Sequence, residues 1–72
     1  MRKIHITDVL FATIMQHGRT IYTARICGVT SMSEIVKIIS SNMGTIMGMF
    51  TLNLRNGSQG WSTSSSLRLQ RA

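Results

Sequence analysis

Residues 31–44 carry the start, the periodicity and the end of one amphipathic helix, and this helix constrains the fold more than any other feature. Ser31 and Glu34 are spaced as a capping box, in which the Ser31 hydroxyl accepts the amide hydrogen of Glu34 and the Glu34 carboxylate accepts that of Ser31. Gly44 stands where a left-handed residue would end the helix. The apolar side chains recur at helical spacing: Met32, Ile35, Val36, Ile39 and Met43, with Ile38 at the edge.

The region before this helix, residues 9–26, is predicted to be a β-hairpin. His17-Gly18 separates two runs rich in β-branched and aromatic residues, and the glycine supplies the positive φ of a tight turn. Folding about this turn pairs Ile14 with Ile21, Thr13 with Tyr22, and Phe11 with Ala24. We expect the face with both aromatic residues to enter the core: Val9, Phe11, Met15, Tyr22, Ala24 and Ile26. The opposite face holds Leu10, Ala12, Ile14, Ile21, Thr23 and Arg25.

A helix is the alternative for the first half of this region. Asp8 would be its N-cap, residues 9–17 its body and Gly18 its C-cap. The segment is apolar all round and rich in β-branched residues, which favours the strand.

The region after the helix predicts a second hairpin. A turn at Asn56-Gly57 sets Leu52 opposite Trp61, and a looser loop through Gly60 sets Leu54 opposite Trp61. Both registers keep the apolar residues on one face: Ile46, Phe50, Leu52, Leu54, Trp61, Thr63, Leu67 and Leu69. The other face holds Met47, Met49, Thr51, Asn53, Arg55, Ser62, Ser64, Ser66, Arg68 and Gln70. The serine-rich run is typical of a polar edge strand.

The expected fold is therefore α+β, a single domain over residues 1–72 with the order ββαββ. Two hairpins form a four-stranded, mostly antiparallel sheet, and one helix packs on one of its faces. In element order the chain resembles the β-grasp roll of immunoglobulin-binding bacterial domains. That resemblance implies central, parallel first and last strands, but no motif of that family is present, so it implies no function.

The charge of the chain is strongly one-sided, with 8 Lys and Arg against 2 Asp and Glu and a net charge of +6. This balance favours an anionic partner. A lone cysteine, Cys27, excludes an internal disulfide and fits a reducing, cytoplasmic location. No secretory signal is evident, and polar residues and glycines interrupt the longest uncharged run, residues 38–54, so we expect no membrane span.

Residues for catalysis are scarce, and we expect no enzyme, no cofactor and no metal. Glu34 is used by the capping box, which leaves Asp8 without a carboxylate partner. Cys27 and His17 lie about ten residues apart along extended strands, too far for a nucleophile and its base, although His5 could come closer.

The helix-free face of the sheet is the candidate site, with two competing interpretations. Its apolar residues predict self-association or a protein partner: Leu10, Ile14, Ile21, Met47 and Met49. Its arginines predict phosphate binding by a nucleic-acid-associated protein: Arg25, Arg55, Arg68 and Arg71. Because the expected registers place all four aromatic residues on the helix side, we expect nucleic-acid binding by this face to be electrostatic, without base stacking.

Overall fold

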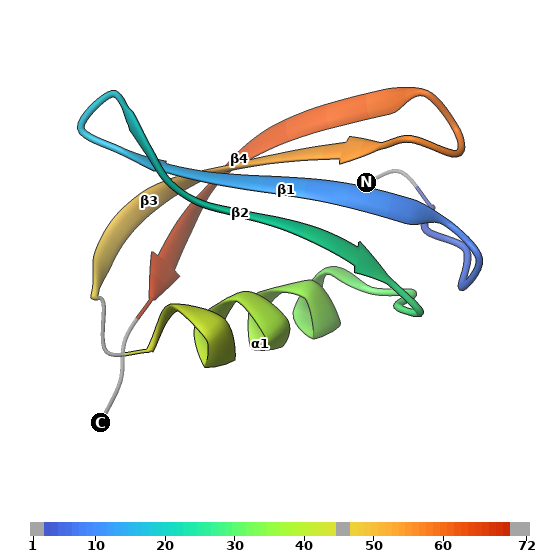
Figure 1. Cartoon of the computed structure of the whole chain (residues 1–72), viewed down its shortest axis with the longest axis horizontal. Coiled ribbons are helices and arrows are strands. Elements are labelled where there is room, and N and C mark those ends of the chain that lie inside the picture. The colour runs from blue at the N-terminus through green and yellow to red at the C-terminus, as the bar shows by residue number, and fades with distance from the viewer. Residues whose placement is uncertain (1–2, 45–46, 70–72) are drawn as a thin grey trace.

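The computed structural model describes residues 3–44 and 47–69 and has the order ββαββ. Its strands are β1 (Val9–Gln16), β2 (Arg19–Cys27), β3 (Gly48–Asn56) and β4 (Trp61–Leu69), and its helix is α1 (Met32–Met43). The strands form one sheet in the order β2-β1-β3-β4, and each neighbouring pair is antiparallel. Figure 1 shows α1 beneath one face of the twisted sheet, with no helix over the other. The expected α+β architecture is confirmed.

The strand order differs from that of a β-grasp roll. The central strands are β1 and β3, which are antiparallel, and the last strand lies at an edge. The connection through α1 runs from the edge strand β2 to β3, which pairs with the free side of β1. The similarity to the β-grasp roll is therefore limited to element order.

The helix begins and ends as the sequence predicts. Ser31 is the N-cap, and its Oγ accepts a hydrogen bond from the Glu34 amide at 3.4 Å. Glu34 differs in one detail, because its carboxylate accepts the amide hydrogen of Thr30, at 2.8 Å, instead of that of Ser31. Gly44 ends the helix with a φ of 73°. The buried residues of α1 are Ile35, Ile39 and Met43.

The β1–β2 hairpin is a pair of strands, as expected, but its register contains an irregularity. The pairs Ile14↔Tyr22 and Met15↔Thr20 leave Ile21 as an extra residue of β2. This bulge shifts the pairing by one residue, which exchanges the two faces of a strand. The predicted pairing and core face of β1 are therefore wrong: Leu10, Ala12 and Ile14 are buried, and Phe11 lies on the helix-free face.

The turn of this hairpin requires positive φ at two positions, His17 (54°) and Gly18 (74°). Histidine tolerates the left-handed region, whereas a β-branched residue is strained there. We expect His17→Val to lower the free energy of unfolding by about 1–2 kcal/mol. His17→Asn should be neutral or stabilising, because asparagine suits this turn position. Urea unfolding followed by circular dichroism measures both changes, and equal midpoints for the two variants would contradict the expectation.

The β3–β4 hairpin keeps the predicted faces but not the predicted registers. Asn56 pairs with Trp61 across a four-residue loop, so neither Leu52 nor Leu54 lies opposite Trp61. The three registers differ by even numbers of residues, which leaves the faces unchanged. Phe50, Leu52, Leu54 and Leu69 are buried on the helix side, whereas residues 62–66 of the edge strand β4 are all exposed.

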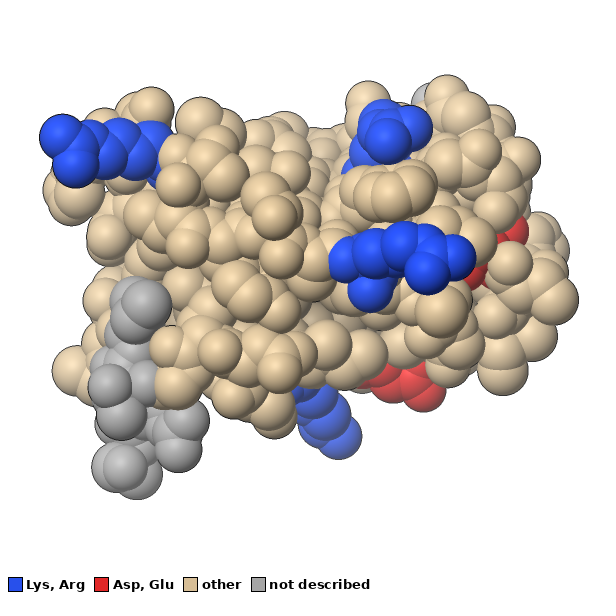
Figure 2. Space-filling model, viewed as in Figure 1, with Lys and Arg blue, Asp and Glu red and all other residues tan. Residues whose placement is uncertain are grey.

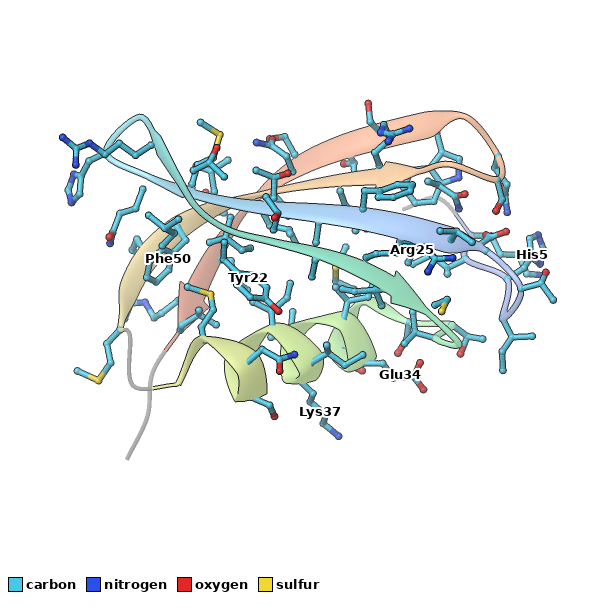
Figure 3. The ribbon with its side chains drawn as sticks, in the orientation of Figure 1. His5, Tyr22, Arg25, Glu34, Lys37 and Phe50 are labelled. Atoms are coloured by element: carbon cyan, nitrogen blue, oxygen red, sulfur yellow. The ribbon has the colours of Figure 1, made fainter. Side chains whose placement is uncertain are left out.

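The core lies between the sheet and α1. Figure 3 shows Tyr22 and Phe50 directed into this space, and Lys37 directed from the helix away from the sheet. The fully buried aliphatic side chains are Leu10 and Ile14 of β1, Ile35 and Ile39 of α1, and Leu52 and Leu54 of β3. Among the residues that the structure describes, no helix combines the length and the hydrophobicity needed to cross a membrane.

Candidate functional site

The helix-free face carries a row of side chains across all four strands. Phe11 pairs with Arg25 of β2 on one side and with Arg55 of β3 on the other, and Arg55 pairs with Ser62 of β4. Directly paired residues of antiparallel strands present their side chains on the same face. An aromatic ring with an arginine in register on each side therefore lies on this face. We call Arg25, Phe11 and Arg55 the Arg-Phe-Arg row.

Phe11 is fixed from two directions. The Arg55 guanidinium carbon lies 4.5 Å from the centroid of the Phe11 ring, a cation–π contact. The ring edge packs against Gly57, where an added Cβ would come within 3.0 Å of the ring carbon Cε2. Gly57 itself is held by a hydrogen bond from its amide to the Val9 carbonyl, at 2.9 Å. The result is a half-buried ring with a cation over it.

The next row along the sheet is polar: Thr23, Thr13, Asn53 and Ser64. Asn53 is oriented from both ends of its amide, because Ser64 donates to its Oδ1 and its Nδ2 donates to the Met15 sulfur. An open hollow spans the β1, β3 and β4 positions of this row and of the row through Phe11 and Arg55. Its lining includes Phe11, Thr13, Asn53, Arg55, Ser62 and Ser64.

The far end of the face carries a third arginine. Arg68 of β4 pairs with Met49 of β3, and its Nε contacts the Met49 sulfur at 3.4 Å. Arg55 follows Met49 by six positions along β3, which is roughly 20 Å along an extended strand. The arginines thus stand at both ends of the face, with the hydroxyls and the amide between them.

Among the residues that the structure describes, no carboxylate belongs to this face. The only acidic residues of the chain are Asp8 and Glu34. Asp8 is buried, and Glu34 is bonded at the start of the helix, beyond the other face of the sheet. Figure 2 shows two Lys or Arg side chains close together over the sheet, toward the right-hand end of the view. The potential over the helix-free face is therefore positive.

A buried polar network lies at the end of the sheet next to the Arg-Phe-Arg row, where Leu10 pairs with Asn56. One carboxylate oxygen of Asp8 accepts hydrogen bonds from the His5 amide (2.9 Å), from Asn56 Nδ2 (2.8 Å) and from Gln59 Nε2 (2.8 Å). Asn56 Oδ1 accepts the amides of Ser58 and Gln59, each at 2.9 Å. The bonds from His5 and Asn56 hold the pKa of Asp8 below its ordinary value, against the opposing effect of burial. This network sets the position of the loop that carries Gly57.

The residues predicted as an apolar interface do not form one surface. Leu10 and Ile14 are 0% exposed in the core, so their placement on the helix-free face was wrong. The bulge explains the error, since it reverses the faces of β1 relative to the expected pairing. Ile21 (39%), Met47 (58%) and Met49 (52%) are exposed.

Three of the four predicted phosphate-binding arginines are described, and all three lie on the helix-free face. Arg25 and Arg55 flank Phe11, and Arg68 lies at the other end. Arg71 lies outside the described residues, as do Ile46 and Gln70.

Phe11 is a surface residue that the sequence did not predict. One signal pointed to it: Thr13 shares the parity of Phe11, whereas Leu10, Ala12 and Ile14 make an entirely apolar set. Core faces favour aliphatic residues without polar neighbours, so this alternation favours the observed arrangement. The presence of an aromatic residue predicted the core face of β1 less well than the fully apolar set on the other face did.

Cys27 and His17 remain apart in the fold. Cys27 is exposed at the end of β2, whereas His17 lies in the turn that precedes that strand. Within residues 3–44 and 47–69, no group of three His, Cys, Asp or Glu side chains is placed to bind a metal ion.

Comparison with known proteins adds no relative, because no protein family model, no curated protein and no solved structure matches the chain.

Proposed function

We propose that this protein is a non-enzymatic nucleic-acid-binding module that holds phosphates on the helix-free face of its sheet. The observation that carries the proposal is the grouping of Arg25, Arg55 and Arg68 on one face, where none of the described residues is a carboxylate. Arginine donates several hydrogen bonds in a geometry that matches phosphate oxygens. Serine and threonine hydroxyls between the arginines are further phosphate donors.

A protein partner or a homodimer has less support as the occupant of this face. Two of the five apolar residues expected there, Leu10 and Ile14, are buried in the core. Met49 and Ile21 remain exposed, but polar side chains and arginines make up most of the face around them. A stable interface needs a contiguous apolar centre.

The test is the affinity of the purified protein for fluorescein-labelled 20-mer oligonucleotides, single-stranded and duplex, measured by fluorescence anisotropy. We expect Arg25→Gln combined with Arg55→Gln to weaken binding on the order of 10- to 100-fold at 50 mM salt, because two phosphate contacts are lost. Each lost contact should also reduce the slope of log K against log salt by about 0.7–0.9.

The matched control is Arg19→Gln combined with Lys37→Gln, which removes the same net charge from the β1–β2 turn and the helix, both away from the Arg-Phe-Arg row. We expect the control to change affinity by less than about threefold, since distant charges act only through the screened long-range field. Equal losses in the two double variants would contradict a site on the sheet. No binding by the unaltered protein at low salt, together with a mass that rises with concentration in light scattering, would favour self-association instead.

A further inference from the structure

We infer that the ligand of the helix-free face is a single-stranded nucleic acid, one base of which stacks on the Arg-Phe-Arg row. This inference rests on the proposed function and names its substrate class. It depends on a different observation from the charge of the face, namely the position and environment of Phe11.

Phe11 is an exception among the aromatic side chains. Tyr22, Phe50 and Trp61 pack against or within the core, whereas Phe11 is half-buried on the opposite face. A large apolar ring on a polar surface loses stabilisation unless something covers it. Here the cover is the guanidinium of Arg55, which leaves a ring and a planar cation stacked on an open surface.

This arrangement suits an unstacked base. Bases in single strands stack on aromatic rings and on guanidinium planes, whereas the bases of a duplex are already stacked on one another. Arg55 can either move aside or lie between the ring and the base. Arg25, in register on the other side of Phe11, is placed to hold the adjoining phosphate.

The neighbouring row supplies groups for the edge of such a base. Thr13 and Asn53 line the same hollow as Phe11 and Arg55. The Asn53 amide is already oriented by Ser64 and Met15, so a hydrogen bond to a base would require little further ordering. From this hollow, the strand direction leads toward Arg68, whose pairing with Met49 places it at the far end of the face.

The experiment distinguishes the contribution of the bases to the binding affinity from that of the phosphates. Three fluorescein-labelled probes of equal length are compared: dT12, an abasic phosphodiester 12-mer, and a 12-base-pair duplex. We expect dT12 to bind about tenfold tighter than the abasic probe, because only dT12 offers a base to the ring. Phe11→Leu should bring the affinities for dT12 and the abasic probe to within about threefold of each other, and Phe11→Tyr should retain the preference for dT12.

Each outcome bears on one of the two claims. Equal affinity for dT12 and the abasic probe in the unaltered protein would overturn the stacking inference and leave phosphate binding intact. A preference for the duplex would overturn it as well. Failure of all three probes to bind at 20 mM salt would instead remove the proposed function itself. The comparison of probes on the unaltered protein decides the matter even if Phe11→Leu does not fold, which circular dichroism will show.

Discussion

Asn56→Ala is expected to lower the free energy of unfolding by about 2–4 kcal/mol, because the Asn56 side chain makes three hydrogen bonds without any exposure to water. Its removal leaves two loop amides without their acceptor and takes one donor from Asp8. For a domain of this size, the corresponding loss in Tm is roughly 10–25 °C. A chain of 72 residues has only about 4–10 kcal/mol of stability in total, so part of the population will unfold.

Thermal unfolding followed by circular dichroism measures the effect, and Asn53→Ala is its matched control. Asn53 is the same residue type in the same strand, but it lies half-buried on the helix-free face and bonds to a sulfur and a hydroxyl. We expect this control to cost less than about 1 kcal/mol. Equal losses in the two variants would show that the buried network does not determine stability.

Asn56→Asp tests the contact between residue 56 and Asp8 in a second way, through a stability that should rise as the pH falls. An aspartate at this position would still accept the amides of Ser58 and Gln59, but it would place a second carboxylate against Asp8. Two carboxylates at hydrogen-bond distance cannot both ionise without strong repulsion. This variant should therefore be unstable at pH 7 and recover stability toward pH 4–5, where the pair holds a proton. A Tm independent of pH would contradict the contact.

The sequence predicted those parts of the fold that short-range signals determine. The capping residues Ser31 and Glu34 and the stripe through Ile35 and Ile39 mark one helix without reference to the rest of the chain. In the second hairpin, the predicted loop length was wrong. The assignment of residues such as Leu52 to the core face is still correct, because registers that differ by an even number of residues keep the same faces. Local periodicity thus determines which residues form the core of β3 and β4.

The candidate site could not be predicted to the same extent, because it depends on one inserted residue. Ile21 is the extra residue of a bulge, and a regular hairpin about His17-Gly18 places Phe11 in the core. Bulges follow from how the whole sheet packs, and Ile21 itself has no distinctive local signal. The strand order also could not be predicted from the sequence. The sequence therefore predicted that Arg25 and Arg55 share a face, but not that both flank Phe11.

Acid should destabilise the protein through Asp8. The pKa of this carboxyl is held below its unfolded value of about 3.9, first by the His5 amide and then by Asn56, with the charge of His5 and the Gln59 amide also contributing. A lowered pKa means that the unfolded chain binds the proton more readily. The stabilisation is therefore complete above about pH 4, and it is lost as the pH falls through the lower, folded-state pKa.

Two substitutions separate the charge of Asp8 from its hydrogen bonds. Asp8→Ala removes the acceptor of three bonds and should lower the Tm strongly at pH 7. Asp8→Asn keeps a carbonyl oxygen for the same donors, so it should cost less at pH 7 and should lose less further stability between pH 4 and pH 2 than the unaltered protein. Tm values measured from pH 7 to pH 2 check both results. If the Tm of Asp8→Asn fell with pH as steeply as that of the unaltered protein, the result would contradict the role of the Asp8 charge in acid stability. Because this network sets the loop whose Gly57 contacts Phe11, both variants should also shift the ring resonances of Phe11.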